Sequence, residues 1–161
     1  MRTGEAMSTD WRARAAQAME DSGHRLGGGA RKAVVDLLAR QDCCLSAQEI
    51  RDELRSEGPG VGLASVYRAI ELLLGLGLVQ RVDVGEGGQR YEAVVPGGEH
   101  HHHAVCESCG RVTAFEDPRL EQAIEQVSGQ LGHSVSGHDV LLRGTCARCE
   151  RTPAPSGRSG S

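Results

Sequence analysis

Residues 61–94 read VGLASVYRAIELLLGLGLVQRVDVGEGGQRYEAV, and this stretch decides the fold of the first half of the chain. Up to Leu74 the apolar residues recur at helical spacing. After Gly77 they alternate with polar residues, on both sides of a glycine-rich turn at 85–88. Two short extended runs around such a turn predict a β-hairpin. The stretch therefore predicts a helix followed by a hairpin.

The residues before this stretch also have helical periodicity, for example at Val34, Leu37 and Leu38. Ser46-Ala-Gln-Glu49 has the pattern of a capping box, in which two side chains satisfy each other's backbone N–H groups at the start of a helix. Three or four helices followed by a hairpin is the order of a winged-helix DNA-binding domain. In that fold the last helix enters the major groove and the hairpin lies against the DNA backbone.

Three polar residues in the last helix are candidates for DNA contact. Ser65, Tyr67 and Arg68 cannot all share the apolar face of the helix that spans 63–70, so they point outward, where phosphates or base edges are met. The simpler alternative is that they are ordinary solvated helix residues. The net charge of −4 does not by itself indicate nucleic-acid binding, so any DNA contact depends on local basic residues.

The second half begins after a Gly- and Pro-rich segment at 95–99, which predicts a hinge. It reads as a strand at 100–105, a strand at 111–115, a helix at 118–131 and a strand at 134–142. So small a unit usually needs a covalent or metal staple to be stable.

Four of the six cysteines supply this staple, as two C-x-x-C pairs. Four thiolates close a tetrahedral structural zinc site and leave no open position for chemistry. A redox dithiol is the alternative, but two pairs are present and neither has a thioredoxin-like context. The predicted zinc ligands are Cys106, Cys109, Cys146 and Cys149.

The run of four histidines at 100–103 predicts two further metal sites. Side chains alternate between the two faces of a strand, so His100 and His102 point one way and His101 and His103 the other. Glu121 and His138 are available to complete one site. Imidazole and carboxylate ligands suit zinc, ferrous iron or nickel. The alternative is a solvated histidine tract that binds metal weakly.

Neither end of the chain predicts compact structure. Residues 1–9 and 151–161 are rich in small and polar residues, which favours disorder. No stretch approaches the roughly 18 apolar residues of a membrane-spanning helix, and no signal peptide is evident. We therefore expect a cytoplasmic protein.

Over about residues 10–150 the chain resembles the ferric uptake regulator family. The matching stretches are SAQEIRDEL, VGLASVYRAIELL, HHHHAVCESCGRVTAFED and HDVLLRGTCARC. The resemblance implies an α+β protein with a winged-helix DNA-binding domain at 10–94, a hinge at 95–99 and a small α/β dimerisation domain at 100–150 that holds structural zinc. It also implies a homodimeric, metal-dependent repressor of operator DNA rather than an enzyme. One family metal site maps onto His100, His102, Glu121 and His138.

A regulatory site at the domain junction maps less completely. Glu92, His101 and His103 match the family pattern, but Cys44 stands where a histidine is common and Ala114 where a carboxylate is common. A thiolate at Cys44 would favour a softer ion such as zinc, whereas the alternative is that Cys44 is a buried small hydrophobe. The regulatory divalent metal implied is Fe(2+) or Zn(2+).

The resemblance further implies a basic arm, represented here by Arg25, although the run of three glycines that follows alters its geometry. Two other functions compete with the reversible metal sensor. One is a peroxide sensor in which bound iron oxidises a histidine ligand. The other is a metal-dependent hydrolase, which would need an open coordination position and a nearby acid or base.

Overall fold

The computed structural model describes residues 4–58, 60–85, 88–95 and 101–151, with side chains described from residue 10 onward. The chain divides into two compact units, residues 1–99 and 100–161. The division falls at the end of the predicted hinge, of which residues 96–99 lie outside the described part, as does the predicted disordered tail from residue 152.

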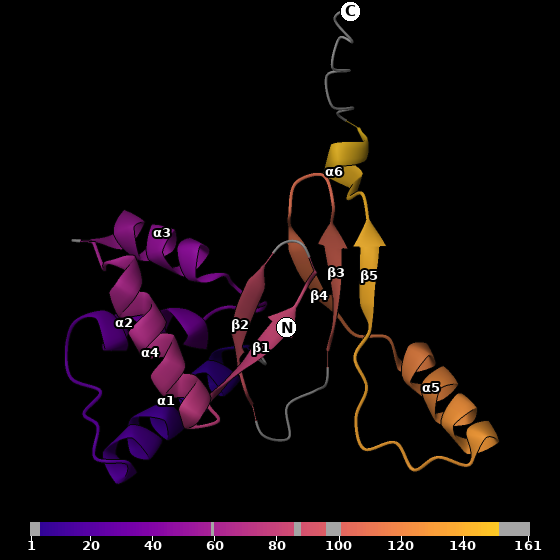
Figure 1. The fold of residues 1–161 in the computed structure, drawn as a ribbon, viewed down its shortest axis with the longest axis horizontal. Coiled ribbons are helices and arrows are strands. Elements are labelled where there is room, and N and C mark those ends of the chain that lie inside the picture. Colours follow the sequence, from indigo (N-terminus) through magenta and orange to yellow (C-terminus); the bar gives the residue numbers. More distant parts are fainter. Residues whose placement is uncertain (1–3, 59, 86–87, 96–100, 152–161) are drawn as a thin grey trace, which may run out of the picture. The chain divides into compact units, whose positions relative to one another are not determined.

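The first unit is a winged-helix domain, as the sequence predicts. Its elements, shown in Figure 1, are α1 (Gly4–Asp21), α2 (Ala30–Ala39), α3 (Ala47–Glu57), α4 (Leu63–Gly75), β1 (Val79–Asp83) and β2 (Gln89–Ala93). The two strands pair antiparallel, from Val79 opposite Ala93 to Asp83 opposite Gln89. Apolar side chains from all four helices form one core, which includes Trp11, Val34, Ile50, Val66 and Leu73.

The start of α1 corrects one expectation. The helix begins at Gly4, so residues 4–9 are helical and not disordered. Trp11, Ala15 and Met19 recur at intervals of four residues and are fully buried, and the Trp11 indole N–H donates to the Leu78 carbonyl at 3.0 Å. Once these residues anchor the helix, adding turns at its end costs little, because propagation is far easier than nucleation.

The ends of α3 and α4 follow from local sequence. The capping box is present: the Glu49 N–H donates to Ser46 Oγ at 3.2 Å, and the Ser46 N–H donates to a Glu49 carboxylate oxygen at 2.8 Å. After α4 the chain passes through Gly77, whose φ of 66° is in the left-handed region that favours glycine. The Leu78 N–H then bonds back to the Leu73 carbonyl at 2.9 Å, which turns the chain directly into β1.

The second unit is a small α/β domain. Its elements are β3 (His102–Cys106), β4 (Val112–Phe115), α5 (Pro118–Leu131), β5 (Leu141–Gly144) and α6 (Ala147–Glu150). The strand order is β4-β3-β5, with β4 antiparallel and β5 parallel to β3 (Figure 1). Helix α5 has the predicted bounds, with Asp117 as its N-cap and Pro118 in its first turn.

The last strand differs from its prediction. The sequence predicts a strand at 134–142, whereas β5 covers 141–144 and residues 133–140 have no regular structure. The position of β5 is set by its pairing with β3, from His103 opposite Leu141 to Cys106 opposite Gly144. None of the described helices combines the length and apolar character needed to cross a bilayer.

Candidate metal centres and nucleic-acid interface

The four predicted zinc ligands lie together at one end of the second unit. Cys106 ends β3, Cys109 lies in the turn after it, and Cys146 and Cys149 lie at the N-cap and inside α6. All four sulfur atoms lie within 4.8 Å of one another. The Cys109 and Cys146 sulfurs are 3.9 Å apart. Two ligands of a tetrahedral zinc, each with a Zn–S bond of about 2.3 Å, are separated by about 3.8 Å, so the cluster fits the ion.

Hydrogen bonds within this cluster shift the pKa values of its thiols in opposite directions. The Cys146 N–H donates to Cys106 Sγ at 3.3 Å, and this bond is the main cause that lowers the pKa of Cys106 to about 6. The hydrogen bond with Cys109 is the main cause that raises the pKa of Cys149 to about 12. Four adjacent thiols cannot all ionise without a counter-charge, and a bound Zn(2+) supplies it. The cluster has the composition and spacing of a structural zinc site, and a zinc ion bound there would tie the end of β3 to the segment after β5.

A second cluster of metal-ligating side chains lies between β3 and α5. His102 Nε2 is 2.7 Å from Glu121 Oε1, and His138 Nε2 is 3.1 Å from Glu121 Oε2. His102 is 1% exposed, and its ring also packs against Phe115. The hydrogen bond from His102 is the main cause that lowers the pKa of Glu121, which favours its carboxylate form. Two imidazoles and one carboxylate suit a divalent transition metal.

The described histidines separate as strand alternation predicts. His102 turns toward Glu121 and His138, whereas the rings of His101 and His103 lie together, with centroids 5.0 Å apart. His101 precedes β3, so the strand begins later than predicted. His100, the fourth predicted ligand of the Glu121 site, lies outside the described residues.

The first unit contributes Glu92 and Cys44 to the predicted junction set. Leu45 and Tyr91 form an isolated antiparallel bridge, with N–H···O distances of 3.0 and 2.8 Å. Cys44 therefore lies across from Glu92 on the neighbouring strand, β2. Glu92 also accepts a hydrogen bond from Gln80 Nε2 at 2.6 Å. His101 and His103 belong to the second unit.

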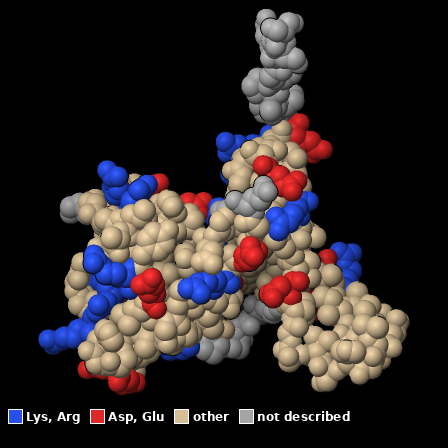
Figure 2. All heavy atoms as spheres, viewed as in Figure 1, with Lys and Arg blue, Asp and Glu red and all other residues tan. Residues whose placement is uncertain are grey.

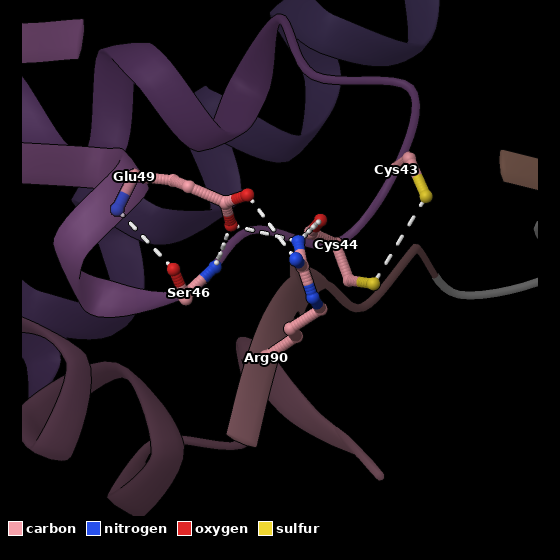
Figure 3. Close-up of polar contacts among 5 residues, drawn as sticks. All are labelled: Cys43, Cys44, Ser46, Glu49 and Arg90. Atoms are coloured by element: carbon pink, nitrogen blue, oxygen red, sulfur yellow. Dashed lines mark hydrogen bonds and ion pairs between the residues drawn. The ribbon is translucent and has the colours of Figure 1, made fainter. Parts of the chain in front are cut away.

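The sequence did not predict the polar contacts that fix the backbone at Cys44. Arg90, which is 8% exposed, forms an ion pair with Glu49, with nitrogen–oxygen distances of 2.7 and 3.1 Å, and its Nη1 lies 3.5 Å from the Cys44 carbonyl oxygen (Figure 3). The same Glu49 carboxylate completes the Ser46 capping box. A single network thus joins the start of α3, the wing strand β2 and the Cys44 loop. Only the capping-box pattern was visible in the sequence.

The predicted DNA-contacting residues lie where the sequence placed them. Helix α4 buries Val66, Ile70 and Leu73, while Tyr67 and Arg68 are exposed and Ser65 is half-buried. Arg68 Nη2 donates to Ser65 Oγ at 3.3 Å, which holds the two side chains together on the outer face. Arg25 is exposed in the loop before α2. Figure 2 shows Lys and Arg side chains distributed over the visible face of the first unit.

A winged-helix unit, followed by a small α/β unit with a four-thiolate cluster and an imidazole–carboxylate cluster, defines a metal-binding member of the winged-helix class. The model of the ferric uptake regulator family matches residues 22–143. The ferric uptake regulation protein of Bacillus subtilis (strain 168) is 35% identical over 114 residues, which is 70% of this chain and 76% of the relative. The chain belongs to the ferric uptake regulator family.

Two solved structures extend the comparison. The Helicobacter pylori ferric uptake regulator, described as having three functional metal-binding sites, superposes with a TM-score of 0.77 at 25% identity, over 91% of this chain and 96% of that one. A zinc uptake regulator complexed with zinc and DNA superposes with a TM-score of 0.51 at 26% identity, over 89% of this chain and 95% of that one. The protein is thus a regulator of the ferric uptake regulator type.

Proposed function

We propose that the protein is a metal-responsive transcriptional repressor that binds operator DNA as a homodimer. This proposal rests on the burial pattern of α4. The helix buries one face in the winged-helix core and leaves Tyr67 and Arg68 exposed on the other. An exposed arginine on such a helix suits bidentate contact with guanine or a phosphate. The similar zinc uptake regulator has been solved with DNA. A repressor that binds operator DNA would act in the cytoplasm, where that DNA is found.

The second unit offers a surface for a second copy. Val127 and Leu131, four residues apart on α5, are 52% and 66% exposed, and Leu142 on the edge strand β5 is 52% exposed. In Figure 2 the visible face of α5 is mostly uncharged, and blue Lys or Arg atoms lie only near the start of the helix. Exposed apolar residues on a helix and an open strand edge are both typical of surfaces that another protein covers. A symmetric dimer would present two recognition helices to two half-sites of a pseudo-palindromic operator.

Metal would control DNA binding by favouring one arrangement of the two winged helices. In the proposed junction site, Glu92 and Cys44 come from the first unit and His101 and His103 from the second. An ion bound by both units stabilises the arrangement in which it has all its ligands, so it raises operator affinity if that arrangement is the DNA-binding one. The candidate ions are Fe(2+) and Zn(2+). The site with His100, His102, Glu121 and His138 would support the same state from within the second unit.

The proposed role is ligand-controlled binding and not catalysis. The four-thiolate cluster leaves no coordination position for a substrate or a water molecule. In the described part of the second unit, His102, His138 and Glu121 contact one another directly, as expected of side chains that share one ion.

Replacing Arg68 or Tyr67 by alanine should weaken operator binding without affecting metal content or dimerisation. A lost base or phosphate contact costs about 1–3 kcal/mol, which corresponds to roughly a 5- to 150-fold loss of affinity. The measurement is fluorescence anisotropy with a duplex selected from random sequences by the wild-type protein.

The matched control is Arg119→Ala, which removes the same charge from an exposed position of the second unit. This variant should bind the duplex like the wild type. Unchanged affinity for both α4 variants would show that α4 is not the helix that reads DNA.

A further inference from the structure

The first unit contains two adjacent cysteines, Cys43 and Cys44, whose sulfur atoms lie 4.0 Å apart (Figure 3). In an extended chain, neighbouring side chains point to opposite faces. Here the chain bends at 42–43, between the end of α2 and the Leu45 bridge, and the two sulfurs come to the same side. Cys44 is buried and Cys43 is half-buried.

The spacing of this pair matches that of two sulfurs on one metal ion. The Cys109 and Cys146 sulfurs of the structural zinc site are 3.9 Å apart, and the edge of an ideal tetrahedral zinc–thiolate site is about 3.8 Å. The Cys43–Cys44 pair needs a movement of only a few tenths of an ångström to hold the same kind of ion.

The surrounding structure fixes the backbone that carries the pair. The Leu45 bridge joins the loop to β2, and the Arg90 guanidinium lies against the Cys44 carbonyl while it is held by Glu49. A preorganised backbone lowers the entropy lost on binding an ion. Glu92 lies across from Cys44 on β2, so a carboxylate is present on the neighbouring strand of the same unit.

The geometry of the two cysteines suits a disulfide bond less well than it suits a shared metal ion. Consecutive Cα atoms are about 3.8 Å apart, whereas disulfide-bonded residues usually have Cα atoms about 4.4–6.8 Å apart. Two thiolates on an ion do not require a bond between the sulfurs. The short separation along the chain therefore favours chelation over oxidation.

We propose that Cys43 and Cys44 together form a dithiolate chelate for a thiophilic divalent cation of the zinc type. This inference rests on the proposed metal-dependent regulation and assigns Cys43 as a ligand that the family pattern does not supply. Each thiol releases its proton to water as its sulfur binds the ion, so two protons leave per cation bound. Two soft ligands in place of one imidazole shift the preference of the site from Fe(2+) and Mn(2+) toward Zn(2+).

The test uses the full-length protein with its structural zinc retained, and Zn(II) and Co(II) as the probes. Adding Zn(II) should protect the half-buried Cys43 from alkylation by iodoacetamide, as read from peptide masses. Co(II) should produce sulfur-to-cobalt charge-transfer absorption, which should fall by about half in Cys43→Ser and in Cys44→Ser and vanish in the double variant, because each thiolate contributes its own bond. Zinc affinity in Cys43→Ser should fall by more than the roughly 10- to 100-fold seen when an outer-shell partner is lost.

The matched control is Asp42→Asn, which changes the exposed neighbour of the pair and leaves both thiols in place. It should keep the full cobalt absorption and zinc affinity. If Cys43 alkylates at the same rate with and without Zn(II), and the cobalt spectrum of Cys43→Ser equals that of the wild type, the chelate is refuted even where metal still promotes operator binding. If the chelate signals appear but no metal alters operator affinity, the proposed regulation fails and the dithiolate site stands.

Discussion

Replacing Cys149 by serine should remove the tightly bound zinc and unfold the second unit. The four sulfurs join the end of β3 to α6, and this small unit has few buried side chains of its own. A metal site that does not exist in the unfolded chain contributes its binding free energy directly to folding. Three thiolates and a hydroxyl do not reproduce that contribution. Elemental analysis for zinc and circular dichroism during heating are the measurements.

Cys43→Ser is the matched control, because it makes the same substitution outside the four-sulfur cluster. In protein that holds only its structural zinc, this variant should retain that one zinc per chain and the melting behaviour of the wild type. A Cys149→Ser protein that is folded, dimeric and free of zinc would contradict the structural role of the cluster.

Alanine substitutions in the histidine run should fall into two classes. His102→Ala should impair the site with Glu121 and His138, to which its ring is directed. His103→Ala should leave that site in place and impair the junction site, together with His101→Ala, since these two rings lie together. A lost ligand should weaken metal binding at its own site by more than about 10-fold, whereas coupling between sites is the smaller effect.

Metal stoichiometry and competition titrations on the single variants distinguish the two classes. His24→Ala is the control, because His24 is exposed in the first unit and its ring bonds only locally, to Ser22. If the neighbours His102 and His103 give the same defect while His101 and His103 differ, the assignment of both sites is wrong.

Most of the fold was predictable because its signals are local. The capping box at Ser46 and Glu49 and the Asp117-Pro118 start set the first residues of α3 and α5 from a few adjacent side chains. The start of α1 and the position of β5 were not predictable. The first depends on packing of Trp11 into the core, and the second on parallel pairing with a strand more than 30 residues away.

The candidate sites were likewise predictable from sequence spacing only where their ligands lie close together in the chain. Spacing alone grouped the four cysteines, because each C-x-x-C turn presents two sulfurs to one ion. The grouping of Glu121 and His138 with His102 came from the family resemblance, since ligands on separate elements leave no spacing pattern. The closeness of the Cys43 and Cys44 sulfurs depends on a bend that the sequence does not encode in any recognised turn motif.

One titration tests the claim that a regulatory metal controls operator binding. Protein that holds only its structural zinc is added to the selected duplex under anaerobic conditions, and Fe(II), Mn(II), Ni(II) and Zn(II) are titrated in separately. We predict weak binding before metal is added and an increase of roughly 5- to 150-fold, the usual range of allosteric coupling, with Zn(II) or Fe(II). Equal operator affinity with and without every one of these ions would contradict the claim.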